Sequence, residues 1–219
     1  MERRTDIITA ERIMGKNFIG PAQLDSIKEN MGIKSPFQLN IGLPVIRFDE
    51  PTLERSHDDF ILVLGIPEAF DGMPLTINKL RDIFGFNPDI KEPCFYNQDW
   101  YLKEDFANEL ALKLNWYLIG KRMIDSSRGT SPDNSMIRSL AHNMPSAILA
   151  CYTFFVYYFY SNGKILWEND YLWCKDRDSS GDQIYVGRYI DNSRINKNGF
   201  NIHRHLRIKD NYGIVKAFE

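Results

Sequence analysis

Residues 145–160 read PSAILACYTFFVYYFY, and the conformation of this segment decides the fold class. The segment is apolar almost throughout, so we expect it in the core whether it is a helix or a strand. We favour a buried helix, because 16 residues is long for a strand, and because Pro145 and Gly163 suit the two ends of a helix. The alternative is a strand that turns at Asn162-Gly163 into a partner strand at residues 164–167.

Local signals on both sides of this segment predict further elements. Pro21 and Thr76 suit helix starts, and Gly32 and Gly85 suit helix ends, so we predict helices at residues 21–31 and 77–84. Apolar residues at helical spacing predict a third helix at residues 103–114. Prolines predict an irregular segment at residues 33–57. Short apolar or alternating runs predict strands at residues 60–66, 115–120, 172–174, 183–189, 200–208 and 214–218, and around residue 167.

The composition is that of a globular protein. The chain has 219 residues, of which 43% are hydrophobic and 26% are charged, which excludes a disordered protein. The net charge of −2 argues against a dedicated nucleic-acid-binding protein, so we regard nucleic acid as an unlikely partner.

The sequence also bears on the compartment. Residues 1–6, MERRTD, lack the apolar stretch of a signal peptide. The apolar segment at residues 145–160 is too short and too rich in tyrosine to span a bilayer. Three widely spaced cysteines, Cys94, Cys151 and Cys174, indicate free thiols. We therefore expect a cytoplasmic protein without a membrane span; the alternative is secretion by a non-classical route.

Motifs for metal binding and catalysis are weak. Residues 176–182, DRDSSGD, resemble the first half of a calcium loop, but Gly187 stands where the bidentate glutamate is needed, so we favour a hairpin turn. His203 and His205 lie on one face of a predicted strand but lack an evident third ligand. Since no nucleophile elbow or phosphate-binding loop occurs, we expect no metal, no cofactor and no catalytic residue.

The C-terminal segment at residues 191–213 reads DNSRINKNGFNIHRHLRIKDNYG and carries the strongest functional signal. Phe200, Ile202, Leu206 and Ile208 share one face of the predicted strand, while the outward face is lined by Asn201, His203, His205, Arg207 and Lys209. Residues 183–219 contain seven Lys or Arg against three Asp or Glu. This outward face has two interpretations: it is a recognition surface, or it is an ordinary solvated strand face.

The order of several short motifs resembles a known family. These motifs are FANELA at residues 106–111, WYLI at 116–119, WC at 173–174, YVGR at 185–188, GFNI at 199–202 and YGI at 212–214. Residues 100–219 resemble a C-type-lectin-like domain, in particular the variable proteins of diversity-generating retroelements and uncharacterised bacterial relatives. The resemblance implies binding residues in the last strands and loops: Asn196, Asn201, His203, His205, Arg207, Asp210, Asn211 and Tyr212.

We therefore expect an α+β protein. Residues 1–100 form an N-terminal helix and strand extension, and residues 101–219 form a C-type-lectin-like binding domain with two helices and short antiparallel strands. The expected function is non-catalytic binding of a protein or of an anionic or glycan ligand by a polar, mildly basic surface. Further ligand contacts are expected from Arg188, Arg194 and Trp173.

Two alternatives stay open. The first is an enzyme of unknown reaction, with an aromatic-lined cleft between the two halves around Tyr96, Asp99 and Trp100. The second is a structural subunit of an oligomer, sealed by an apolar patch that includes Trp167 and the Tyr157-Tyr158 region.

Overall fold

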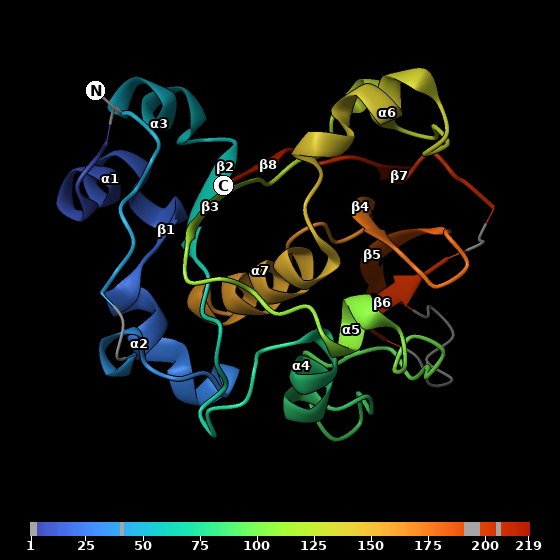
Figure 1. The fold of residues 1–219 in the computed structure, drawn as a ribbon, viewed down its shortest axis with the longest axis horizontal. Helices are drawn as coiled ribbons and strands as arrows, with labels where there is room; N and C mark the ends of the chain where they lie inside the picture. Colours follow the sequence, from blue (N-terminus) through green and yellow to red (C-terminus); the bar gives the residue numbers. More distant parts are fainter. Residues whose placement is uncertain (1–3, 40–41, 191–197, 205–206) are drawn as a thin grey trace.

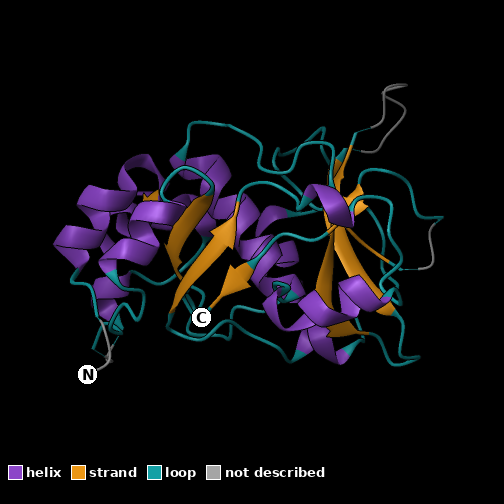
Figure 2. Ribbon diagram, turned by 90° about the horizontal axis from the view of Figure 1, so that it is seen from above, coloured by secondary structure: helices purple, strands orange, loops and turns teal. Residues whose placement is uncertain are grey.

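The computed structural model describes residues 4–39, 42–190, 198–204 and 207–219. It is a mixed α+β fold with two four-stranded sheets in the described part of the chain. Helix α7 (Ala147–Tyr160) lies between the two sheets in Figure 1, and Figure 2 shows the same arrangement from above. The Ser146 side chain accepts a hydrogen bond from the Leu149 amide at its first turn. The predicted buried helix is therefore confirmed.

The first sheet joins segments that are far apart in the sequence. Its order is β1 (Phe18–Ile19), β2 (Phe60–Leu64), β3 (Trp116–Gly120) and β8 (Ala217–Phe218). The β1–β2 pair is parallel, and the other two pairs are antiparallel. Because strands from both sides of residue 100 pair here and share one hydrophobic core, the two predicted domains are tied together.

The second sheet is formed entirely by the C-terminal part of the chain. Its order is β6 (Gly199–His203), β5 (Gln183–Tyr189), β4 (Tyr171–Arg177) and β7 (Tyr212–Gly213). Strands β4, β5 and β6 pair antiparallel in chain order, whereas β7 runs parallel to β4. The predicted strand at residues 183–189 matches β5 in full.

Local capping accounts for the helices that cover the first sheet and the lower edge of α7 in Figure 1. Helices α2 (Pro21–Met31) and α4 (Ile77–Phe84) begin and end as predicted, with Gly32 and Gly85 after their last residues. Two further helices, α1 (Ile7–Met14) and α3 (Glu50–Ser56), were not predicted. Each begins after an aspartate whose carboxylate accepts an amide of the first turn, which is a signal that the sequence does contain.

Other predictions were wrong. Helix α5 covers only Asp105–Asn108 rather than residues 103–114, because the chain leaves the helix and Ala111 bridges to Thr76. Trp167 is not in a strand: it lies in a turn with φ 54°, in the left-handed region. Strand β6 ends at His203, short of residue 208.

The remaining elements are short. Helix α6 (Ser135–Leu140) lies in a segment without a predicted element. The 3₁₀ turns are η1 (Gly15–Asn17), η2 (Pro36–Gln38), η3 (Asp125–Ser127) and η4 (Ala141–Asn143). Within the described ranges, every helix falls short of the length and apolar character that crossing a bilayer requires.

Candidate functional site

The two faces of the second sheet differ in chemistry. Side chains alternate along a strand, so alternate residues share a face. The face toward α7 carries fully buried apolar side chains: Leu172, Cys174, Ile184, Val186, Phe200 and Ile202. The opposite face carries rings and amides with polar atoms: Tyr171, Trp173, Tyr185, Tyr189, Asn201, His203 and Tyr212. We call the second set the outer face.

Part of the outer face is covered by the chain itself. Ile137 of α6, Met144 and Ile214 pack with the rings of the outer face in a second, smaller core cluster. Trp173 lies under this cover, and its indole N–H donates to the Thr130 carbonyl oxygen at 3.2 Å. Among the described residues, the outer face is hollowed around Tyr171, beside this cover.

The open part of the outer face forms a hollow of about 500 Å³. Its lining residues are Tyr96, Glu168, Asn169, Tyr171, Arg188, Tyr189, Ile190, Asn201, His203, Lys209, Asn211 and Tyr212. This volume lies within the range of about 300–1,000 Å³ that is typical of small-molecule sites. We call this hollow the tyrosine hollow, because four of these residues are tyrosines.

One row of residues across the sheet forms the floor of the tyrosine hollow. Asn201, Gly187, Tyr171 and Tyr212 stand opposite one another on β6, β5, β4 and β7. The rings of Tyr171 and Tyr212 stack with centroids 5.1 Å apart and planes 15° apart. Gly187 has no side chain, so the Tyr171 ring can lie against the β5 backbone at this point.

Burial keeps the phenols of the floor protonated. Burial and the neighbouring Tyr212 phenol together raise the pKa of Tyr171 to about 12, against the lowering effect of its hydrogen bond with Asn201. Burial also raises the pKa of Tyr212, against the effect of its hydrogen bond with Tyr185. At neutral pH both phenols are therefore neutral groups that can donate and accept hydrogen bonds.

The rim of the tyrosine hollow is held by contacts between loops. Arg188 Nη2 donates to Glu92 Oε2 at 2.8 Å, and this guanidinium is only 13% exposed. The Asn211 side-chain amide donates to the Asn169 carbonyl oxygen at 2.7 Å. Tyr96 and Tyr189, which also line the hollow, pack edge to face with centroids 5.3 Å apart.

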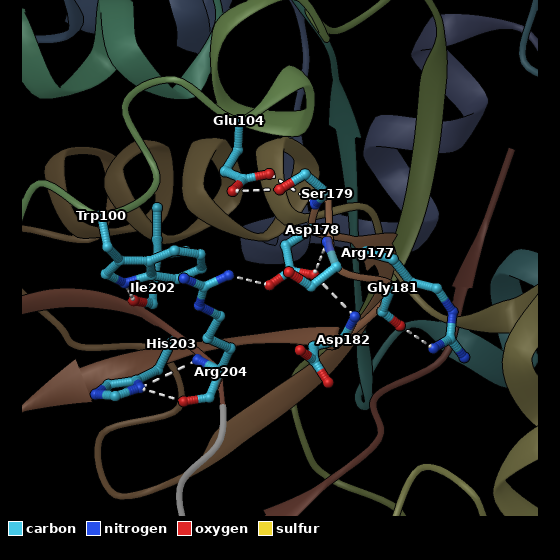
Figure 3. A network of polar contacts seen from close by, with 11 residues as sticks. Trp100, Glu104, Arg177, Asp178, Ser179, Gly181, Asp182, Ile202, His203 and Arg204 are labelled. Carbon is cyan, nitrogen blue, oxygen red and sulfur yellow. Dashed lines mark hydrogen bonds and ion pairs between the residues drawn. The ribbon is translucent and has the colours of Figure 1, made fainter.

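The Asp178 hairpin turn lies next to this sheet and is drawn in Figure 3. The Asp178 carboxylate accepts the amides of Ser180 at 2.9 Å and Asp182 at 2.8 Å, and it forms an ion pair with Arg204. The Arg204 guanidinium lies 4.4 Å from the Trp100 ring centroid. These contacts agree with the hairpin turn that we favoured over a calcium loop. No group of three His, Cys, Asp or Glu suited to a metal ion occurs among the described residues.

The structure brings together five of the predicted ligand-binding residues. Arg188, Asn201, His203, Asn211 and Tyr212 all line the tyrosine hollow. Asn201 and Tyr212 are buried in the floor of this hollow. The alternation along the predicted strand had instead placed Asn201 on an exposed outward face.

Other predicted residues lie elsewhere. Trp173 borders a separate hollow of about 330 Å³ beside Gln183 and Ile208. Arg207 and Asp210 are exposed and do not line the tyrosine hollow. Arg194, Asn196 and His205 lie outside the described residues.

The residues of the two alternatives are also placed. Tyr96 lines the tyrosine hollow, whereas Trp100, whose ring lies against the Arg204 guanidinium, and the exposed Asp99 are not among the described residues of its lining. Trp167 is 5% exposed, and its indole N–H donates to the Gly120 carbonyl oxygen at 3.2 Å. The expectation that Trp167 belongs to a surface patch was therefore wrong, because its ring fills the core of its own chain.

Several lining residues were missed by the sequence reasoning. Tyr171 and Tyr189 are strand residues, whereas Glu168 and Asn169 come from the turn after α7. The alternation of Ile184 and Val186 with Tyr185 and Tyr189 contained a usable signal for the outer face. Glu168 and Asn169 gave no such signal in the sequence, because the position of their turn depends on how α7 packs.

Comparisons of this chain with family models, with curated proteins and with solved structures found no match.

Proposed function

We propose that the protein binds a ligand without catalysis and that the tyrosine hollow is its binding site. The observation that carries the proposal is the contrast between the two faces of the second sheet. The inner face packs buried apolar side chains on α7, as a core requires. The outer face places rings and amides in a hollow of about 500 Å³ that stays open.

The chemistry of the lining supports binding. Phenols, amides and an imidazole offer both donors and acceptors, and rings supply contact area at a low cost in conformational entropy. The raised pKa of Tyr171 makes its phenol a stable hydrogen-bond donor but a poor base at neutral pH. Lining side chains come from all four strands of the second sheet and from loops beside it, so the sheet holds them in fixed positions.

The C-type-lectin-like relationship of residues 101–219 belongs to this proposal. It is supported by the antiparallel order of β4, β5 and β6 beside one long helix, and by four of the eight implied binding residues, which line the tyrosine hollow: Asn201, His203, Asn211 and Tyr212. Diversification of the final segment is a separate question of genomics. A reverse transcriptase gene and a near-copy of the final coding segment beside this gene would support it.

The binding proposal is tested with a chemically broad panel. Free sugars, amino acids, nucleosides, dicarboxylates and short peptides are titrated into isotope-labelled protein while amide resonances are followed. We expect at least one class to shift the resonances of Tyr171, Tyr189 and Asn201 together. The proposal is overturned if no class shifts them, or if shifts occur only at residues remote from the hollow.

A matched pair of variants separates the hollow from the rest of the surface. Tyr189→Ala removes a ring that is 39% exposed at the rim, and Phe70→Ala removes a ring that is 72% exposed outside the hollow. We expect Tyr189→Ala to weaken binding about tenfold, which corresponds to about 1.4 kcal/mol. Phe70→Ala should leave the affinity unchanged.

A further inference from the structure

Residues 94–100 run along the edge of β6 that does not pair with β5. The Phe200 amide donates to the Cys94 carbonyl oxygen at 2.8 Å, and the Tyr96 amide donates to the Phe200 carbonyl oxygen at 2.9 Å. We call residues 94–100 the edge segment. Although the sequence assigned them to the N-terminal extension, the structure places them beside the second sheet, where Gln98 meets Asn201.

The Gln98 side-chain amide contacts two oxygen atoms of β6. Its Nε2 donates to the Ile202 carbonyl oxygen at 2.5 Å and to Asn201 Oδ1. A backbone carbonyl oxygen carries no proton, so the Gln98 atom that faces it is the nitrogen. The same nitrogen needs an acceptor on Asn201, so the Asn201 amide turns its oxygen toward Gln98. One backbone carbonyl therefore fixes the orientation of both side-chain amides.

The other end of the Asn201 amide faces the floor of the tyrosine hollow. Asn201 and Tyr171 lie in one row across the sheet, and between them Gly187 has no side chain. Asn201 is only 3% exposed, so its Nδ2 group has to donate to the protein. The hydrogen bond between Asn201 and Tyr171 lowers the pKa of the phenol, which is the sign expected when the amide donates and so favours the phenolate.

This arrangement gives the Tyr171 hydroxyl a direction. Its oxygen accepts from Asn201, so its proton points elsewhere, and Tyr171 lines the tyrosine hollow. Because the pKa of Tyr171 is raised to about 12, the phenol keeps this proton at neutral pH. A ligand that reaches the phenol therefore meets a hydrogen-bond donor.

We propose that Gln98 is a positioning residue that sets the hydrogen-bond polarity of the tyrosine hollow. By holding the Asn201 oxygen, Gln98 makes the Tyr171 hydroxyl a donor, so the ligand places an acceptor atom such as a carbonyl or ether oxygen over this phenol. The inference rests on the proposed function and adds a determinant of specificity from outside residues 101–219.

The first test needs no ligand. Nuclear Overhauser contacts of the Asn201 side-chain amide protons are measured in the isotope-labelled full chain. We expect their strongest contacts to be with the Tyr171 ring, because Nδ2 faces the phenol. Strongest contacts with the Gln98 side chain would mean that the Asn201 amide has the opposite orientation, and would overturn the inference.

The second test compares two neutral rings of opposite polarity. Pyridine N-oxide carries an acceptor oxygen and no donor, whereas pyrrole carries an N–H donor and no acceptor. Each is titrated into the labelled full chain, and its affinity is taken from the shifts of the Tyr171 and Asn201 amides. We expect pyridine N-oxide to bind about fivefold more tightly, as one neutral hydrogen bond allows. Tyr171→Phe should abolish this preference.

A matched pair of variants separates the polarity of the hollow from the anchoring of the edge segment. Gln98→Leu removes the donor, so the Asn201 amide can turn over and the preference for pyridine N-oxide should fall below about twofold. Trp100 Nε1 donates to the same Ile202 carbonyl oxygen at 3.1 Å, and both residues are labelled in Figure 3. Trp100→Phe removes this other anchor without touching Asn201, so it should leave the preference unchanged.

The possible failures are distinct. If pyrrole binds as tightly as pyridine N-oxide, or if Gln98→Leu keeps the preference, the polarity inference is wrong but the binding function stands. The same conclusion holds if neither probe binds although a class of the broad panel does. If Gln98→Leu does not fold, the two measurements on wild type decide. If neither probe and no class of the broad panel shifts the hollow resonances, both proposals are overturned.

Discussion

The Tyr171 ring lies directly against the Cα of Gly187 on the neighbouring strand. A Cβ at residue 187 would lie 2.7 Å from Cδ1 of Tyr171 and 2.5 Å from the Asp170 carbonyl oxygen. Both distances are too short for nonbonded atoms, so any side chain here would displace the ring and the turn before β4. The floor of the tyrosine hollow thus depends on residue 187 being a glycine.

Gly187→Ala should therefore destabilise the protein by about 1–3 kcal/mol, the usual cost of overpacking. The measurement is the free energy of unfolding from urea denaturation. Gly42→Ala is the control, because a Cβ there meets nothing within 4 Å. Equal stability of the two variants would contradict the packing of Tyr171 on Gly187.

The same relationship shows what the sequence could predict. Elements with local signals were predicted well: Pro21 and Gly32 bound α2, and Thr76 and Gly85 bound α4. The helix predicted at residues 103–114 failed because its apolar spacing was overridden by the bridge from Ala111 to Thr76, a contact between distant segments. Periodicity describes one segment at a time and carries no information about such a contact.

The candidate site also combines features that the sequence predicts with features that it does not. The alternation at residues 200–203 predicted that Asn201 and His203 share a face, and β6 confirms this. That Asn201 stands in one row with Gly187 and Tyr171 follows from the strand register, which is a long-range property. A row of this kind can be predicted only when the pairing of the strands is known.

Asp178→Asn should lower stability near neutral pH. Burial raises the pKa of Asp178, but the hydrogen bond from Arg204 and the amides of Asp182 and Ser180 outweigh this effect, so the net pKa lies below 3.8. A lowered pKa in the folded state stabilises the protein above pH 3.8, and this contribution is lost as the pH falls through the folded value. We expect a loss of about 1–2 kcal/mol at pH 6.

The check is urea denaturation of both proteins from pH 6 down to pH 3. The gap between wild type and Asp178→Asn should narrow as the pH falls below 3.8. A gap that stays constant over this range would show that the pKa of Asp178 is not lowered in the folded state.

Asp176→Asn should show the opposite dependence on pH. The Asp176 carboxylate accepts the Ala147 amide at 2.5 Å at the start of α7. Burial raises the pKa of Asp176, and the Ala147 amide offsets this only in part. A raised acid pKa means that the folded state loses stability as the pH rises from 3.8 through the folded value. Asparagine keeps the acceptor and does not ionise.

The stability of Asp176→Asn relative to wild type should therefore improve as the pH rises from 4 to 7. Asp176→Ala removes the acceptor and should cost about 1 kcal/mol, as loss of a helix cap does. Thermal unfolding of the three proteins at each pH measures both effects. Loss of stability in Asp176→Asn that grows with pH would contradict the raised pKa.

The last prediction concerns the Tyr171 phenol in the floor of the tyrosine hollow. An ordinary tyrosine with a pKa near 10 is half ionised at pH 10. Because burial raises the pKa of Tyr171 to about 12, its phenol stays protonated there and can still donate a hydrogen bond. The affinity of wild type divided by that of Tyr171→Phe for the best ligand should therefore stay constant from pH 7 to pH 10. Taking the ratio cancels the effect of pH on groups that the two proteins share. A ratio that falls about twofold by pH 10 would mean that Tyr171 ionises with an ordinary pKa near 10, and that the floor is open to water rather than buried under the rings of Tyr212 and its neighbours.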